Sequence, residues 1–252
     1  MRRTLAGTGA AIALAACTLS AATPAVAADA PYDVLVFSKT AGFRHDAIPA
    51  GITAIQQLGA ANNFTVTATE DAAAFTTANL AQYEAVVFLS TTGDVLNDTQ
   101  QTAFEGYIRA GGGYVGVHSA ADTEYDWPFY GRLVGAYFAN HPAIQPATFS
   151  VRETWHPSTH PLPARFELRD EIYNFRPFAP GLQLQELLAV DESTYDGGTH
   201  GEHHLVAWYQ LIDGGRAFYT ALGHTPEIYS DSLFRTHLRG GIRSAALGVY
   251  RP

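Results

Sequence analysis

The sequence predicts an α/β domain built on a doubly wound, mostly parallel sheet, with antiparallel strands added at one edge. From residue 32 onward, short apolar runs alternate with helical patterns, and this rhythm favours right-handed parallel crossovers. After residue 122 the runs follow one another without long helices, and Asp213-Gly214-Gly215 indicates a hairpin. A chain of 252 residues with 47% apolar content can bury one sizeable core.

The parallel part of the sheet is expected in the first half of the domain. Its strands are the short apolar or β-branched runs at residues 33–38, 64–68, 85–90 and 114–117. The run at 85–90 is the most hydrophobic, which predicts a central position. Helices are expected at 48–58 and 97–110, the second capped by Asn97 with Gln100 and ended by Gly111.

The second half predicts the antiparallel edge. A short helix is expected at residues 127–135. Strands are expected at residues 147–153, 182–190, 205–211 and 217–222, the last two joined by the hairpin turn. A closing helix is expected at 232–247, with a break or kink at Gly240-Gly241.

The first residues resemble an export signal rather than part of the fold. Met1-Arg2-Arg3 gives a positive start, residues 5–16 are apolar and small, and Ala25-Val26-Ala27 fits a signal-peptidase site. We therefore expect a signal peptide over residues 1–28, a mature domain over 31–252, and a secreted or otherwise extracytoplasmic protein without an integral membrane span. Alternatively, the sequence before Cys17 resembles a lipobox, and lipidation of Cys17 would anchor the protein at the cell surface.

Composition excludes several classes of function. Cys17 is the only cysteine, so a chain cleaved near Ala27 has no disulfide, zinc–thiolate site or cysteine nucleophile. The net charge is -9, the arginines are scattered and Lys39 is the only lysine, which argues against nucleic acid as a partner. Composition says nothing of the oligomeric state.

Two histidines are placed where open α/β sheets bind their ligands. His118 follows the strand at 114–117, and His224 follows the final strand, so both fall at carboxyl ends of strands. If those strands are parallel neighbours, the two imidazoles face each other across a cleft. They would then act as general acid and base or hold a divalent metal. Asp122 follows His118 closely and would orient one imidazole.

Other residues complete the predicted site. His45 lies on the first loop after a strand. Asp170 and Glu171 are adjacent, so in a strand only one of them can enter the cleft, and Glu171 is the candidate. Tyr125, Trp127, Tyr173 and Asn174 suit a sugar, since aromatic faces pack on pyranose C–H groups and amides bind hydroxyls. The stretch 200–204 is rich in histidine but lacks the helical spacing of a metalloprotease site.

Several motifs in order along the chain resemble the trehalose-utilisation (ThuA-like) family. The segments that carry the resemblance are Gly42-Phe43-Arg44-His45, residues 112–120, Tyr125-Asp126-Trp127-Pro128, His156-Pro157, residues 170–175 and residues 214–225. The resemblance implies the class I glutamine amidotransferase-like superfamily and a flavodoxin-like sheet. True amidotransferases carry a cysteine where this chain has His118, and His224-Thr225-Pro226-Glu227 resembles the segment with their catalytic histidine. Without that cysteine, glutamine hydrolysis through a thioester is excluded.

These observations lead to two main hypotheses, beside a third in which the chain is an interaction domain with a vestigial site. The first is an exported enzyme acting on a sugar or glycoside, trehalose-related or a keto-disaccharide, as a hydrolase or an isomerase or lyase. In it His118, His224 and Asp122 are catalytic, and a divalent metal remains open as the cofactor. The substrate-binding residues in this hypothesis are His45, Tyr125, Trp127, Glu171, Tyr173 and Asn174. The second hypothesis is a carbohydrate-binding domain without catalysis, in which loss of either histidine changes affinity only modestly.

Overall fold

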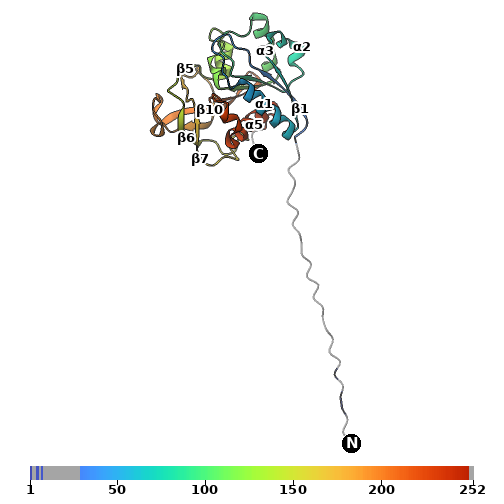
Figure 1. Ribbon diagram of the computed structural model, residues 1–252. Coiled ribbons are helices and arrows are strands. Elements are labelled where there is room, and N and C mark those ends of the chain that lie inside the picture. Colours follow the sequence, from blue (N-terminus) through green and yellow to red (C-terminus); the bar gives the residue numbers. More distant parts are fainter. Residues whose placement is uncertain (2–3, 6, 8–28, 250–252) are drawn as a thin grey trace.

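The computed structural model describes residues 1, 4–5, 7 and 29–249 (Figure 1). Almost all of the expected signal peptide, with Cys17 and the expected cleavage site, lies outside the described residues. Among the helices that are described, none has both the length and the apolar character needed to cross a bilayer.

A nine-stranded sheet runs through the domain in the order β2-β1-β3-β4-β11-β10-β9-β6-β7. The parallel strands are β1 (Tyr32–Phe37), β2 (Phe64–Thr69), β3 (Ala85–Leu89), β4 (Gly113–Val117) and β11 (Gly215–Thr220). The antiparallel strands are β10 (His204–Ile212), β9 (Gln185–Val190), β6 (Gln145–Val151) and β7 (Arg165–Asp170). This topology confirms the predicted α/β class with an antiparallel edge. A separate two-stranded sheet pairs β5 (Phe138–Asn140) with β8 (Asn174–Phe175).

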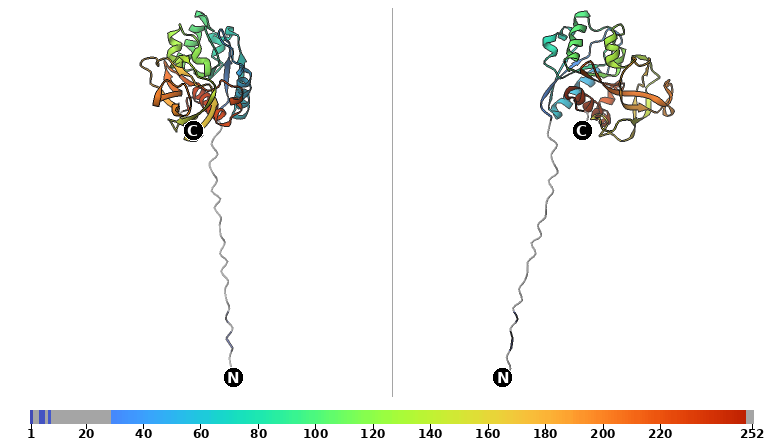
Figure 2. Two further views of the ribbon diagram at one scale, coloured as in Figure 1. Left: turned by 60° about the vertical axis from the view of Figure 1, so that its left-hand side comes forward. Right: turned by 180° about the vertical axis from the view of Figure 1, so that it is seen from behind.

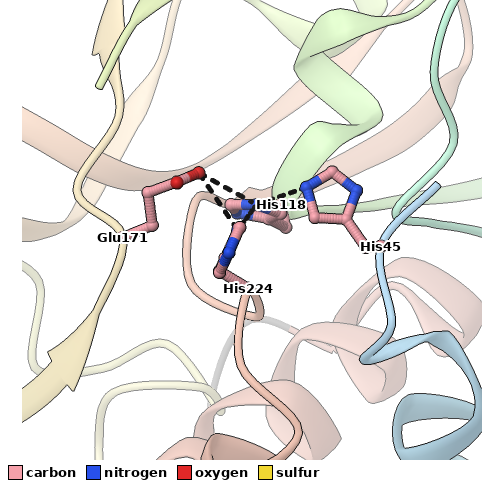
Figure 3. A group of neighbouring side chains, drawn as sticks. All are labelled: His45, His118, Glu171 and His224. Carbon is pink, nitrogen blue, oxygen red and sulfur yellow. Dashed lines mark hydrogen bonds and ion pairs between the residues drawn. The ribbon is translucent and has the colours of Figure 1, made fainter. Parts of the chain in front are cut away.

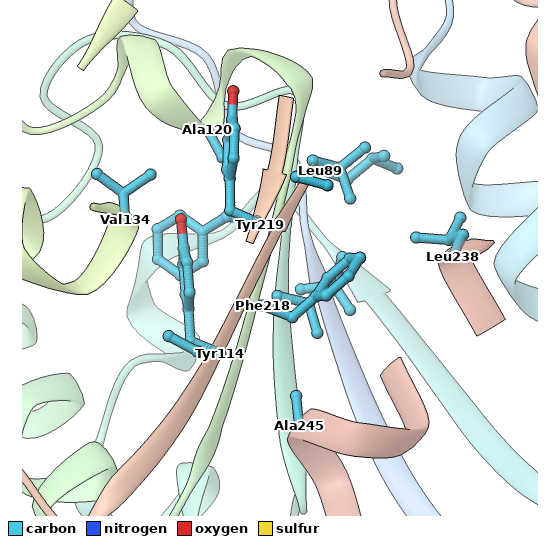
Figure 4. Close-up of a cluster of buried hydrophobic side chains, with 14 of the residues drawn as sticks. Leu89, Tyr114, Ala120, Val134, Phe218, Tyr219, Leu238 and Ala245 are labelled. Carbon is cyan, nitrogen blue, oxygen red and sulfur yellow. The ribbon is translucent and has the colours of Figure 1, made fainter. Parts of the chain in front are cut away.

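Helices cover both faces of the sheet (Figures 1 and 2). The longer helices are α1 (Ile48–Asn62), α3 (Asp98–Arg109) and α5 (Ser232–Leu247), and the shorter ones are α2 (Thr77–Leu80) and α4 (Pro128–Val134). Figure 4 shows Tyr114 and Tyr219 on one side of the central strands, toward Val134 of α4. Phe218 lies on the opposite side, toward Leu238 of α5. Successive side chains of β11 therefore point to opposite faces of the sheet and pack in the core on each face.

Helix α5 is continuous, so the predicted break at Gly240-Gly241 is wrong. A side-chain Cβ at Gly240 would collide with the Pro157 carbonyl, and one at Gly241 would collide with the Phe218 ring. The two glycines thus permit close packing of α5 on the sheet and on the 156–160 loop. The close tertiary packing that they allow outweighs the cost of their low helix propensity.

The antiparallel half of the sheet curls back over the parallel half. Strand β7, which the sequence patterns did not predict, is five steps from β4 in the strand order. Those steps would span about 24 Å in a flat sheet. Yet Glu171, directly after β7, comes within 3.6 Å of His118, directly after β4. Register shifts in β10 against β9 near Ala207 fall within this curved half, where bulges increase bending.

Two histidines are buried away from that meeting point, between α5 and the sheet. His156 and His237 are each 1% exposed. Nδ1 of His156 accepts from the Ser158 N–H at 3.2 Å, and Nδ1 of His237 donates to the Ser158 carbonyl at 3.1 Å. Among the described residues, Nε2 of each ring has no hydrogen-bond partner. Burial lowers the pKa of His156 to about 3 and that of His237 to about 4.

We expect this pair to make the fold sensitive to acid. An unfolded histidine titrates near pH 6.5, so between that pH and the lower pKa of the folded state the unfolded chain binds more protons. The contribution of this pair to the free energy of unfolding is therefore fully present above about pH 6.5. It falls as the pH decreases, by up to about 1.4 kcal/mol per pH unit for each histidine. Urea unfolding at pH 7.5 and 4.5 measures this loss.

The matched variant is His156→Asn combined with His237→Gln. Asn keeps an acceptor for the Ser158 N–H and Gln keeps a donor for the Ser158 carbonyl, but neither can become charged. The free energy of unfolding of the double variant should fall less between the two pH values than that of the wild-type protein. Equal losses in the two proteins would show that this pair does not cause acid sensitivity.

Candidate functional site

His118 lies at a sharp turn at the carboxyl end of β4. Its φ is +53°, a left-handed conformation that is unusual for a residue other than glycine. The Tyr219 hydroxyl supports the turn by donating to the His118 carbonyl at 2.8 Å. Parallel pairing of β4 with β11 brings Ala221 alongside, and His118 Nδ1 donates to its carbonyl at 2.8 Å. This bond fixes the tautomer, so Nε2 offers a lone pair.

Several other groups converge on that lone pair. His118 Nε2 lies 3.2 Å from His45 Nε2, 3.0 Å from His224 Nδ1 and 3.0 Å from the Tyr173 hydroxyl. Figure 3 shows Glu171 and His45 on opposite sides of His118, with His224 below. One ligating atom from each of His45, His118, Glu171 and His224 lies within 4.8 Å of the others. We call these four residues the central cluster.

Each member of the central cluster comes from a different segment. His45 lies on the loop between β1 and α1, and its Nδ1 is 3.3 Å from the Ser119 hydroxyl. Glu171 follows β7, and its Oε2 is 3.1 Å from His224 Nδ1. His224 follows β11 after Gly223, whose φ is +126°. The convergence of His118 and His224 is therefore what the sequence predicts, although their chemical roles remain a proposal.

Asp170 holds the loop that carries His224. Its buried carboxylate accepts from the backbone N–H groups of Gly223 at 2.7 Å, His224 at 3.1 Å and Thr225 at 3.3 Å. Glu171, the next residue, points into the central cluster instead. The sequence expectation that only one of the two carboxylates enters the cleft agrees with this arrangement. Asp170 therefore acts on the site through the backbone of the loop.

Burial and charge give the imidazoles of the cluster different proton affinities. Burial, with the charge of His224 in second place, lowers the pKa of His45 to about 4. Burial and the neighbouring His45 also hold the pKa of His118 well below its usual value. Burial acts in the same direction on His224, but the hydrogen bond and charge of Glu171 outweigh it and raise its pKa. Burial raises the pKa of Asp170 to about 6, against the backbone donors that favour its charged form.

The donor set of the central cluster fits a divalent metal. For bonds of roughly 2.0–2.1 Å, ligand atoms of a tetrahedral zinc site lie about 3.3 Å apart. The distances from His118 Nε2 to the ligating atoms of His45, His224 and Glu171 are 3.2, 3.0 and 3.6 Å, and separations within the whole set extend to 4.8 Å, so the atoms surround one point but are more widely spread than in a closed tetrahedral site. Three imidazole nitrogens and one carboxylate oxygen are suitable ligands for zinc and for other first-row metals. The Ala221 carbonyl and the Ser119 hydroxyl would orient the outer nitrogens of two of the imidazoles.

The remaining predicted residues are placed unequally around this cluster. Tyr173 lies directly against it, since its ring packs on His118 with centroids 4.3 Å apart. Asp122 accepts from the Tyr125 hydroxyl at 2.6 Å, whereas Ala221 is the orienting partner of His118. Trp127 is only 9% exposed, and its ring packs among core aromatic residues.

Two polar residues near the cluster tie neighbouring segments together. The Asn174 amide donates to Asn140 and to the Gly197 carbonyl, and its oxygen accepts from Thr199. Nε2 of His204 lies 2.8 Å from the Tyr173 carbonyl, and Glu192 binds the other nitrogen. These contacts give Asn174 and the histidine-rich loop a supporting place beside the site.

His141 is a neighbour of the cluster that the sequence analysis did not identify. Its Nδ1 lies 2.9 Å from Glu171 Oε1, and its side chain is 42% exposed. Nδ1 is also 2.9 Å from the Pro142 carbonyl, so both contacts favour a proton on Nδ1. Its position could not be predicted from the sequence, because β5 and β8, which place it, are too short to recognise.

Comparisons with known proteins agree with this architecture. The family profile described as trehalose utilisation, ThuA, matches residues 33–245. A ThuA-like protein from Bacteroides uniformis superposes with a TM-score of 0.73 at 23% identity, covering 91% of this chain and 98% of the other. One from Parabacteroides merdae gives a TM-score of 0.74 at 20% identity, covering 87% and 91%. A comparison with curated proteins finds no match.

Proposed function

This chain belongs to the ThuA, or trehalose-utilisation, family, and from that premise we propose that it is an exported, metal-dependent enzyme acting on a sugar or glycoside. The observation that carries the proposal is the convergence of four ligating atoms within 4.8 Å at the carboxyl edge of the parallel strands. Family membership favours a trehalose-related substrate, and the donor set favours chemistry at a carbonyl or hydroxyl oxygen. The composition of residues 1–28 supports export.

The residues of the central cluster have distinct tasks in this proposal. His45, His118, His224 and Glu171 Oε2 would hold a divalent cation, and His224 Nδ1, which lies 3.1 Å from Glu171 Oε2, would have to be free of its proton to be a ligand. Bound there, a divalent cation supplies Lewis-acid polarisation of a substrate oxygen. Such polarisation suits a keto-sugar, because it acidifies the C–H next to the carbonyl.

Proton exchange with the substrate falls to the groups beside the cluster. His141 keeps its Nδ1 on Glu171 Oε1 and, among the described residues, has no partner at Nε2. That nitrogen can take or return a proton at a substrate carbon or oxygen. The Tyr173 hydroxyl, 3.0 Å from His118 Nε2, donates a hydrogen bond toward the same space and can orient a substrate oxygen. Its raised pKa, caused first by burial, keeps this hydroxyl protonated.

Metal removal is the direct test. The purified mature chain should contain about one equivalent of a divalent transition metal by elemental analysis. Dialysis against a chelator should abolish conversion of keto-disaccharides such as 3-keto-trehalose, and adding the same metal back should restore it. Product analysis by chromatography provides the readout.

The same experiment separates the proposal from its rival. Sugar binding without product, in a protein whose affinity is unchanged by the chelator, would contradict the enzyme and leave a carbohydrate-binding domain. A protein that converts the substrate equally well after complete metal removal would contradict the role of the metal alone.

A further inference from the structure

An exposed aromatic side chain stands beside the buried central cluster. Phe43 is 68% exposed, which is high for a large apolar residue in the folded domain. Its ring meets the His45 ring edge to face, with centroids 4.9 Å apart and planes at 81°. The contact with His45 therefore involves a small part of the Phe43 surface. Phe43 is therefore largely open to solvent while in direct contact with a member of the cluster.

The loop that carries Phe43 is held in place although its ring is open. The Thr92 hydroxyl donates to the Phe43 carbonyl at 2.8 Å. The Thr92 carbonyl accepts from the N–H groups of Ala41 at 2.7 Å and Gly42 at 3.3 Å. Arg44 makes two hydrogen bonds to the Glu70 carboxylate, at 3.0 and 2.6 Å. A ring presented on a fixed backbone loses less entropy when it binds a ligand than one on a loose loop.

The aromatic residues that the sequence offers for sugar binding do not supply such a surface. Trp127 is 9% exposed and Tyr173 is 3% exposed. Tyr125 is half-buried, with Arg176 4.3 Å from the centroid of its ring and Tyr137 4.7 Å away. Phe43 thus supplies the open apolar face beside the cluster that these three lack.

A charged acceptor lies at the same rim. Asp46 is exposed and directly follows His45 in the chain. Figure 3 places His45 on the side of the cluster opposite Glu171, the residue that His141 contacts. An apolar face next to a carboxylate matches a pyranose, which presents C–H groups on its ring face and hydroxyls around its edge.

We infer that Phe43 is a stacking platform for a pyranose ring of the substrate, on the His45 side of the central cluster. The inference rests on the proposed function and adds to it a subsite for the sugar unit adjacent to the reacting one. The face of the phenyl ring carries the negative part of its quadrupole, which attracts the polarised C–H groups of the sugar. Burial of both apolar surfaces contributes to binding rather than to the chemical step.

The test uses Phe43→Ala, Phe43→Leu and Phe43→Trp in the full mature chain, with 3-keto-trehalose as substrate and trehalose as the ligand for calorimetry. Phe43→Ala and Phe43→Leu should raise KM and Kd about tenfold, because leucine keeps apolar volume but has no aromatic face. Phe43→Trp should stay close to the wild-type values. In all three variants kcat should change less than about twofold and the metal content should be unchanged.

Leu211→Ala is the matched control. Leu211 is 63% exposed and pairs with Arg216, which pairs in turn with Gly113 at the amino end of β4, the edge opposite the cluster. This variant should leave KM and Kd unchanged. Wild-type affinity in Phe43→Ala would overturn the inference but not the proposed function. Loss of metal together with kcat in this variant would do the same. A wild-type protein that neither binds nor converts either sugar would overturn both the inference and the proposed function.

Discussion

Replacing His118 with alanine is expected to lower kcat/KM on a keto-disaccharide by at least about a thousandfold, which is roughly 4 kcal/mol of transition-state stabilisation. His118 is fully buried, and its Nε2 is the atom on which the other cluster members converge. Without it the remaining groups lose a ligand and their common centre. We therefore expect the variant to lose its metal as well, measured by elemental analysis beside the kinetics.

A second variant separates chemistry from folding. His118→Asn is the conservative choice because asparagine tolerates the left-handed backbone that this position requires. It should be as stable as His118→Ala or more so, and equally inactive. His203→Ala serves as the control, since this histidine is 59% exposed and pairs with Glu186 on the surface. Either His118 variant with activity within about tenfold of wild type and a full metal content would contradict the assigned role.

Replacing Asp170 with alanine is expected to cost about 3 kcal/mol of stability, because it leaves buried backbone donors of the His224 loop unpaired. For a domain of this size, that loss corresponds to a decrease in Tm of roughly 6–12 °C. Activity should also fall, since His224 is no longer held against Glu171. Thermal unfolding in the presence of a chelator measures the structural part without the contribution of the metal.

The adjacent carboxylate provides the contrast. Glu171→Gln removes a cluster ligand but leaves the backbone bonds of Asp170 intact. It should therefore lose metal and activity while retaining, in chelator, most of the wild-type stability. An unchanged Tm in Asp170→Ala would contradict the role that we assign to Asp170 in holding the backbone of the His224 loop. Equal destabilisation of the two variants would show that the pair acts as one structural unit.

Local signals in the sequence predict the parallel half of the fold and part of the site. The capping box of Asn97 with Gln100 is formed, and Gly111 takes a φ of +100° just after the helix. His118 and His224 can be placed together because each directly follows an apolar strand run. Residues at the carboxyl ends of neighbouring parallel strands necessarily meet at one edge.

The rest depends on contacts that no local pattern encodes. Strand β7 alternates exposed and buried residues and carries charges on its exposed face, so its run is not strongly apolar. The place of Glu171 follows from the curl of the whole antiparallel half. Trp127 is a sugar-binding candidate by its residue type, but tertiary packing buries it in the core. His141 depends on the short pairing of β5 with β8.

The curl of the sheet brings the end of its edge strand β7 into contact with the ends of its central strands. His45, His118 and His224 follow strands of the parallel half, whereas Glu171 arrives from the last antiparallel strand in the order. A cation bound by all four would act as a clasp between the rim and the middle of the molecule. Loss of the ion would weaken the packing of the antiparallel edge, and local unfolding of that edge would release the ion. Activity would therefore require the complete tertiary structure.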